Sequence, residues 1–274
     1  MADIDTGTND LLASLDGGVL TLTLNRPEAR NAMSDEMNQA LARQLASAEL
    51  DPQVKCVVLT GAGKGFCAGG DVKGMNSRNT GESEGRGSID AAIHRQRVNQ
   101  RATAGKLFKM PKPVVAQFDG AAAGAGLSMG LACDLRVAGQ SCKITTAFAK
   151  VGFSGDYGGT YFLTQLLGSA RARELYLLSP VLTAPEAQAL GMVTKVVPDA
   201  EVEAAARELA LSLAQGPSIA LGYIKRNINN AEHLSLEACF DGEAIYHTRS
   251  GETADHKEAA KAFVEKRKAM FQGQ

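Results

Sequence analysis

The sequence of 274 residues contains no tryptophan, no excess of either charge and no long hydrophobic run. Its 29 basic and 30 acidic residues give a formal net charge of −1, which provides no positive field to attract nucleic acid or an anionic membrane. No segment approaches the roughly 18 consecutive apolar residues that a membrane-spanning helix needs. The N-terminal residues lack the basic and apolar parts of a signal peptide. We therefore expect a cytoplasmic protein that binds neither nucleic acid nor membranes.

Motifs for disulfides and metal ions are also missing. The five cysteines are an odd number without a C-x-x-C pair, and the histidines of the C-terminal region have no spacing such as H-x-x-x-H. We expect buried free thiols in a reducing cytosol and no metal ion. His94, a single histidine in a predicted helix, is interpreted as exposed or structural.

The apolar residues that are present follow the periods of both strands and helices. Leucines and threonines alternate in residues 19–24, and Gly17 and Gly18 supply a turn before them, which predicts a hairpin of half-buried strands. Ser34 is a favoured N-cap for an amphipathic helix. The β-branched run 56–60 is typical of a strand buried on both faces. This mixture predicts an α/β core with an added helical segment.

Two glycine-rich segments follow predicted strands. In residues 61–75, Phe66 replaces the third glycine of a dinucleotide motif, and Lys64 is not followed by the Ser or Thr of a phosphate loop. In residues 118–133, small residues lead into an apolar helix, where a bare backbone can approach a ligand and free N–H groups suit an oxyanion. The alternative is that these small residues only allow tight helix packing.

Two further segments have a clear pattern. Residues 76–88 are polar and rich in glycine and serine, which predicts a mobile loop. A helix is expected over residues 90–108, with Ile93, Val98 and Leu107 as its apolar members.

Six blocks give the sequence a family resemblance. They are LTLNRPEARNAM, VVLTGAGKGFCAGGDVK, KPVVAQFDGAAAGAG, ACDLRVA, FAKVGFSGDYGGTYFL and HKEAAKAFVEKRKAMF. In this order, over about residues 19–271, the chain resembles the enoyl-CoA hydratase/isomerase (crotonase) superfamily. The resemblance implies a crotonase-like β-spiral core of two sheets wrapped by helices in residues 1–200. It implies a helical region in residues 201–274 that builds homotrimers or dimers of trimers.

The resemblance also implies the ligand and its contacts. The substrate would be an acyl-CoA thioester of fatty acid or other lipid metabolism, which carries coenzyme A itself, so no separate cofactor is expected. By motif alignment, the backbone N–H groups of Gly70 and Ala125 would form an oxyanion hole. The resemblance assigns substrate and CoA binding to Ala68, Asp71, Val72, Lys73, Lys64 and Lys266. A family lysine is replaced by Glu28, for which Arg30 could compensate.

The acid/base residues depart from the hydratase pattern. Ser128 and Phe148 replace the two glutamates with which hydratases of the family activate water, and neither is a competent base. Asp156 remains at a position where isomerase branches carry their proton-transferring acid, and its apolar neighbours would raise its pKa. The dehalogenase branch pairs its aspartate with a tryptophan that this chain lacks. The resemblance therefore favours an enoyl-CoA isomerase with Asp156 as the catalytic acid/base.

Other interpretations stay open at this point. Asp156 could simply cap the helix that begins near Gly159, since aspartate is a favoured cap. The chain could also be a hydratase-type enzyme with an atypical water arrangement. A non-catalytic acyl-CoA-binding protein is the third possibility.

Overall fold

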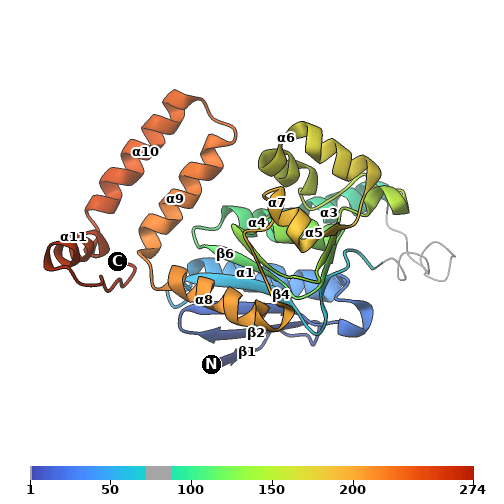
Figure 1. Cartoon of the computed structure of the whole chain (residues 1–274), viewed down its shortest axis with the longest axis horizontal. Helices are drawn as coiled ribbons and strands as arrows, with labels where there is room; N and C mark the ends of the chain where they lie inside the picture. Colours follow the sequence, from blue (N-terminus) through green and yellow to red (C-terminus); the bar gives the residue numbers. More distant parts are fainter. Residues whose placement is uncertain (1, 72–87) are drawn as a thin grey trace.

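Two sheets form the framework of the protein (Figure 1), for which a computed structural model describes residues 2–71 and 88–274. The larger sheet contains, in order, β1 (Ala2–Ile4), β2 (Leu11–Asp16), β3 (Val19–Leu24), β4 (Cys56–Gly61), β6 (Val114–Phe118), β8 (Leu135–Gly139) and β11 (Lys195–Val197). The smaller sheet contains β10 (Leu182–Thr183), β9 (Lys143–Thr145), β7 (Ala121–Ala123) and β5 (Gly65–Cys67). Helices surround both sheets, as expected for the predicted α/β class.

The strand order brings the two glycine-rich segments together. Strands β3, β4, β6, β8 and β11 run parallel, and β4 pairs directly with β6. The segments after β4 and β6 leave the same edge of the sheet and continue as β5 and β7, which pair with each other. The described residues 61–71 and residues 118–133, about sixty positions apart in sequence, therefore become neighbours.

Several local predictions are confirmed. Strands β2 and β3 form the antiparallel hairpin around Gly17 and Gly18, with the leucines of β3 buried. The Ser34 side chain accepts the Met37 N–H at 3.0 Å and caps α1 (Asp35–Leu50). All six residues of β4 are buried. The five cysteines are free thiols, and all except Cys239 are buried.

The helix expected over residues 90–108 is divided in two. Helix α3 (Ile89–Ala102) ends at Thr103, which has the non-helical values φ −113° and ψ −90°, and α4 (Ala104–Lys109) begins at the next residue. The buried Thr103 hydroxyl donates to the Asn99 carbonyl at 2.7 Å, a local bond that competes with helix continuation. Leu107 is buried on α4, whereas Ile93 and Val98 are exposed on α3.

The remaining helices of the core lie on both sides of the sheets (Figure 1). They are α5 (Ala125–Leu131), α6 (Gly159–Leu178), α7 (Ala184–Ala189) and α8 (Val202–Ala214), with short 3-10 helices at Pro27–Ala29, Phe148–Val151 and Asp199–Glu201. Helix α7 begins with the capping box of Thr183 and Glu186. Helix α8 packs its alanines against the larger sheet, so the helix that opens the predicted C-terminal region covers the core.

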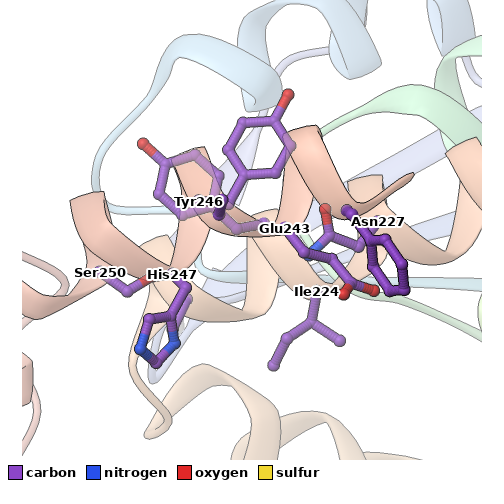
Figure 2. Close-up of a pocket in the computed structure, with 10 residues that line it drawn as sticks. Ile224, Asn227, Glu243, Tyr246, His247 and Ser250 are labelled. Atoms are coloured by element: carbon purple, nitrogen blue, oxygen red, sulfur yellow. The ribbon is translucent and has the colours of Figure 1, made fainter. Parts of the chain in front are cut away.

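The last helices stand away from the sheets as a C-terminal arm (Figure 1), residues 218–274. The arm consists of α9 (Ser218–Ala231), α10 (Leu236–Gly251) and α11 (Ala254–Glu265). The apolar side chains of Ile224, Phe240 and Ile245 are each more than half exposed. They are therefore not buried in the core of this chain. Figure 2 shows side chains of α9 and α10 around a groove of about 600 Å³.

One buried cation attaches the arm to the core. The Lys225 Nζ of α9 donates to the carbonyls of Leu107 at 2.8 Å and Lys112 at 3.1 Å, and to Asp134 Oδ2 at 2.8 Å. Asp134 Oδ2 also accepts the Val114 N–H at 2.7 Å. All three donors of the ammonium group thus have an acceptor. In the described parts of the chain, no helix is long and apolar enough to cross a membrane.

Candidate active site

The glycines of the two segments serve two different purposes. A Cβ on Gly120 would lie 2.1 Å from the Lys64 carbonyl oxygen, and one on Gly126 would lie 2.4 Å from that of Cys67, so these glycines allow the segments to pack. Gly69 and Gly124 have φ values of +97° and +53°, which disfavour other residues, and they shape the turns at the cavity. Packing therefore accounts for Gly120 and Gly126, and at Gly69 and Gly124 the backbone conformation is a further requirement.

The geometry leaves the predicted oxyanion donors available. Ala125 is the first residue of α5, where a backbone N–H has no acceptor within the helix. Met33 forms a parallel bridge with Gly70, in which the Met33 N–H donates to the Gly69 carbonyl at 2.8 Å. In this bridge geometry the N–H of Gly70 itself points away from Met33. Gly70 and Ala125 both line one cavity.

This cavity has a volume of about 390 Å³ and is mostly apolar. It is lined by Ala68, Gly70, Gln96, Gly124, Ala125, Ala147, Phe148, Val151, Phe153, Ser154, Gly155 and Asp156. The structure therefore brings Asp156 to the same space as Gly70 and Ala125. Among the described lining residues, Asp156 is the one with an ionisable side chain.

An unusual backbone holds Asp156 in this position. Gly155, Tyr157 and Gly158 have φ values of +115°, +49° and +77°. Helix α6 begins at Gly159 with Gly158 as its N-cap, and no side chain caps it. The interpretation of Asp156 as a helix cap is therefore wrong, because its carboxylate lies at the cavity instead.

The surroundings of Asp156 change its acidity. Burial raises the pKa of this carboxyl to about 6, and a hydrogen bond from Gln96 Nε2 to Oδ2, 3.4 Å long, opposes the increase. Its Oδ1 is buried and has no hydrogen-bond partner among the described residues. A pKa near 6 suits a group that both takes and returns a proton near neutral pH.

Ser128 and Phe148, which the resemblance aligns with the two hydratase glutamates, belong to a packed pair of rings and two hydroxyls. Phe148 stacks on Tyr176 with centroids 5.9 Å apart and planes 4° apart. The Ser128 hydroxyl donates to the Gly124 carbonyl at 3.3 Å, and a Cβ on Gly159 would lie 2.3 Å from the hydroxyl oxygens of both Ser128 and Tyr176. No carboxylate is among these described groups, so they offer no base for activating water.

The residues predicted to contact CoA do not all lie at this cavity. Ala68 lines the cavity, Asp71 forms an ion pair of 3.3 Å with Arg26, and Lys64 is exposed. Val72 and Lys73 lie outside the described residues, as do residues 76–87 of the predicted mobile loop. Lys266 lies at the end of α11, on the opposite side of the molecule from α3 (Figure 1). His94 is exposed on α3 and does not line the cavity.

Three residues near the cavity were not predicted from the sequence. Gln96 and Gln100 contact the Asp156 loop from α3, and Tyr176 reaches it from α6. The only available signal was the spacing of the two glutamines, which puts them on one face of a helix. Tyr176 gave no signal, because it lies within an ordinary helical segment.

Comparisons with known proteins give matches over nearly the whole chain. The enoyl-CoA hydratase/isomerase family model matches residues 14–274. The chain is 40% identical over 263 residues to 1,2-epoxyphenylacetyl-CoA isomerase of Escherichia coli K12, covering 96% of this chain and 98% of the relative. It is 31% identical to the short-chain-enoyl-CoA hydratase of Clostridium acetobutylicum, covering 95% and 96%. The crystal structure of an enoyl-CoA hydratase from Polaromonas sp. JS666 has a TM-score of 0.88 and 31% identity, covering 95% and 99%.

Proposed function

The chain belongs to the enoyl-CoA hydratase/isomerase family, and from this premise we propose that it is an enoyl-CoA isomerase that moves a double bond of an acyl-CoA thioester. The observation that supports the proposal is the position of Asp156. Its carboxyl lines the same cavity as Gly70 and Ala125, while Ser128 and Phe148 stand where hydratases of the family carry glutamates.

The proposed reaction is a 1,3-proton shuttle. The thioester oxygen would bind the N–H groups of Gly70 and Ala125, and the Asp156 carboxylate would remove a proton from C2 of a β,γ-unsaturated substrate. The electron pair of the broken C–H bond would spread over the oxygen and C4 as a dienolate, which the two N–H groups stabilise. Return of the proton to C4 then gives the α,β-unsaturated thioester and restores the carboxylate. No water is consumed.

Three measurements on the wild-type protein test the proposal: isomerisation of a 3-enoyl-CoA, hydration of crotonyl-CoA and binding of CoA thioesters. We expect rapid conversion of a 3-enoyl-CoA to the conjugated 2-enoyl-CoA, followed by absorbance, and little hydration of crotonyl-CoA. Substantial hydration would favour the alternative of a hydratase with atypical acid/base residues. Tight binding of CoA thioesters without turnover of either substrate would favour the non-catalytic acyl-CoA-binding protein.

The pH dependence of the reaction follows from the raised pKa of Asp156. The carboxylate must be ionised to accept a proton, and its pKa is about 6. We expect kcat to be constant above about pH 7 and to decrease about tenfold per pH unit once the pH falls below the pKa. A pH–rate profile checks this, and an acidic limb near pH 4, where ordinary aspartates titrate, would contradict it.

The residues that line the cavity also support a second candidate reaction. Phe148 and Phe153 line the cavity, which suits an aromatic or other cyclic acyl group, and the relative from Escherichia coli is named for isomerising 1,2-epoxyphenylacetyl-CoA. A carboxyl with a pKa of about 6 could protonate an epoxide oxygen as it opens. Turnover of this epoxide but not of 3-enoyl-CoA would favour this second candidate.

We also propose that the protein assembles into homotrimers or dimers of trimers through its C-terminal arm. The exposed apolar side chains of Ile224, Phe240 and Ile245 support this, because monomers rarely expose so much apolar surface on adjoining helices. The groove of Figure 2 lies between the helices that carry them. Sedimentation velocity would test the proposal, and a monomer at micromolar concentration would contradict it.

A further inference from the structure

Helix α3 directs apolar residues outward and polar residues inward. Ile89, Ile93 and Val98 are 77%, 43% and 47% exposed. Gln96 and Gln100, which lie one turn apart, are partly covered. Burial of apolar side chains normally orients a surface helix, and it does not account for this orientation. When a helix beside a proposed active site turns its apolar residues away from the core, a functional constraint is the expected cause.

The two glutamines bind consecutive residues of the loop that carries Asp156. Gln96 Nε2 donates to Asp156 Oδ2 at 3.4 Å, and Gln100 Oε1 accepts the Tyr157 N–H at 2.7 Å. Tyr157 has a φ of +49°, a costly conformation for a residue with a large side chain. The surrounding structure must maintain this conformation, and α3 contributes to it at both the carboxylate and the following peptide group.

We propose that Gln96 and Gln100 are positioning residues that orient the Asp156 carboxylate for proton transfer, an inference that rests on the proposed isomerase function. Gln96 engages Oδ2 and so restricts rotation of the carboxylate, while Oδ1 is buried and has no partner among the described residues. An O–H bond forms on the Asp156 carboxylate as the C2–H bond breaks, and it breaks again as the proton moves to C4. A buried oxygen without a partner is unfavourable in the resting protein, which favours its taking up the proton.

The groups that face the carboxylate are few. Tyr176 approaches from α6 and Tyr157 follows in the chain, and the charge of Asp156 contributes to raising the pKa of both phenols. Both tyrosines are neutral in the range where Asp156 titrates. The neighbouring ionisable side chains of α3, which are His94, Arg95 and Arg97, are exposed. Gln96 therefore supplies the hydrogen bond that opposes the effect of burial on the Asp156 pKa.

Two substitutions of nearly equal shape test the proposal through the direction of each hydrogen bond. Gln96→Glu removes the donor that Asp156 requires, whereas Gln100→Glu keeps an oxygen that can accept the Tyr157 N–H. On the plateau of the pH–rate profile we expect kcat to decrease about 10- to 100-fold in Gln96→Glu. Gln100→Glu should keep kcat within about threefold of wild type, whereas Gln100→Leu should lower it about tenfold. KM should change little in all three variants.

A measurement that does not need turnover completes the test. Carbon-13 NMR titration, with the Asp156 signal assigned by its loss in Asp156→Asn, should give a higher pKa for this carboxyl in Gln96→Leu than in wild type. Gln39→Leu, the same change at an exposed position of α1, should alter neither the pKa nor kcat. An unchanged pKa in Gln96→Leu, or equal rates for Gln96→Glu and wild type, would overturn the proposal. A raised pKa in a protein that isomerises no enoyl-CoA would instead retain the role of Gln96 and remove the proposed function.

Discussion

Replacing Asp156 by asparagine is expected to lower kcat for isomerisation by about 10²- to 10⁴-fold, the range that a general acid/base usually contributes. Asparagine has nearly the same shape as aspartate, but it can neither accept the C2 proton nor return it to C4. Binding should persist, because the contacts that we propose for the thioester oxygen come from the backbone N–H groups of Gly70 and Ala125. The measurement is kcat for 3-enoyl-CoA together with the dissociation constant of a saturated acyl-CoA. Isomerisation that is unaffected by the substitution would exclude Asp156 as the catalytic group.

Stability provides the control for this variant. The Asp156 pKa is about 6 in the folded protein, whereas aspartate in an unfolded chain has a pKa of about 3.9. Between these values the folded protein holds a proton that the unfolded chain releases, so the free energy of unfolding decreases as the pH rises from about 4 to about 6. The asparagine side chain of the variant does not ionise and would avoid this loss. We expect Asp156→Asn to unfold at an equal or higher temperature than wild type at pH 7, with the advantage disappearing below about pH 4.

Replacing Lys225 by methionine is expected to reduce the free energy of unfolding by about 3–5 kcal/mol, the usual result of removing one partner of a buried ion pair. Methionine fills similar volume but leaves Asp134 Oδ2 without its cation and the Leu107 and Lys112 carbonyls without a donor. Burial already raises the pKa of the Asp134 carboxyl, and Lys225 opposes that effect. Equilibrium denaturation in urea, followed by circular dichroism, measures the change.

Lys106→Met is the matched control for this substitution. Lys106 forms a 2.6 Å ion pair with Glu49, and its side chain is 28% exposed, whereas that of Lys225 is 7% exposed. The two carboxylates, Glu49 and Asp134, are each 28% exposed, so the pairs differ in the burial of the cation. A partly solvated pair of this kind contributes about 1 kcal/mol or less. Adding Asp134→Asn to Lys225→Met should recover part of the lost stability, because it removes the unpaired charge. Equal losses for Lys225→Met and Lys106→Met would mean that the buried contact has no special role in attaching the arm.

The local structure of this protein could be predicted where it depends on neighbours in sequence. The β2–β3 hairpin and the Ser34 cap of α1 both follow from short patterns, and both are confirmed. The family and its fold class were also evident from six sequence blocks, and the family model and the solved relatives confirm them. The single helix expected over residues 90–108 is wrong, because the buried Thr103 divides it.

The sequence by itself determined which chemical groups the cavity could contain. It has Ser128 and Phe148 at the positions that the family resemblance aligns with two hydratase glutamates, and it supplies Asp156 among apolar neighbours. It could not determine whether that carboxylate would cap α6 or face the cavity, since both roles use the same residue at the same position. Only the tertiary structure decided this, because the parallel pairing of β4 with β6 joins the two glycine-rich segments and α3 brings Gln96 and Gln100 to the Asp156 loop. These contacts link residues tens of positions apart, so no local pattern could encode them.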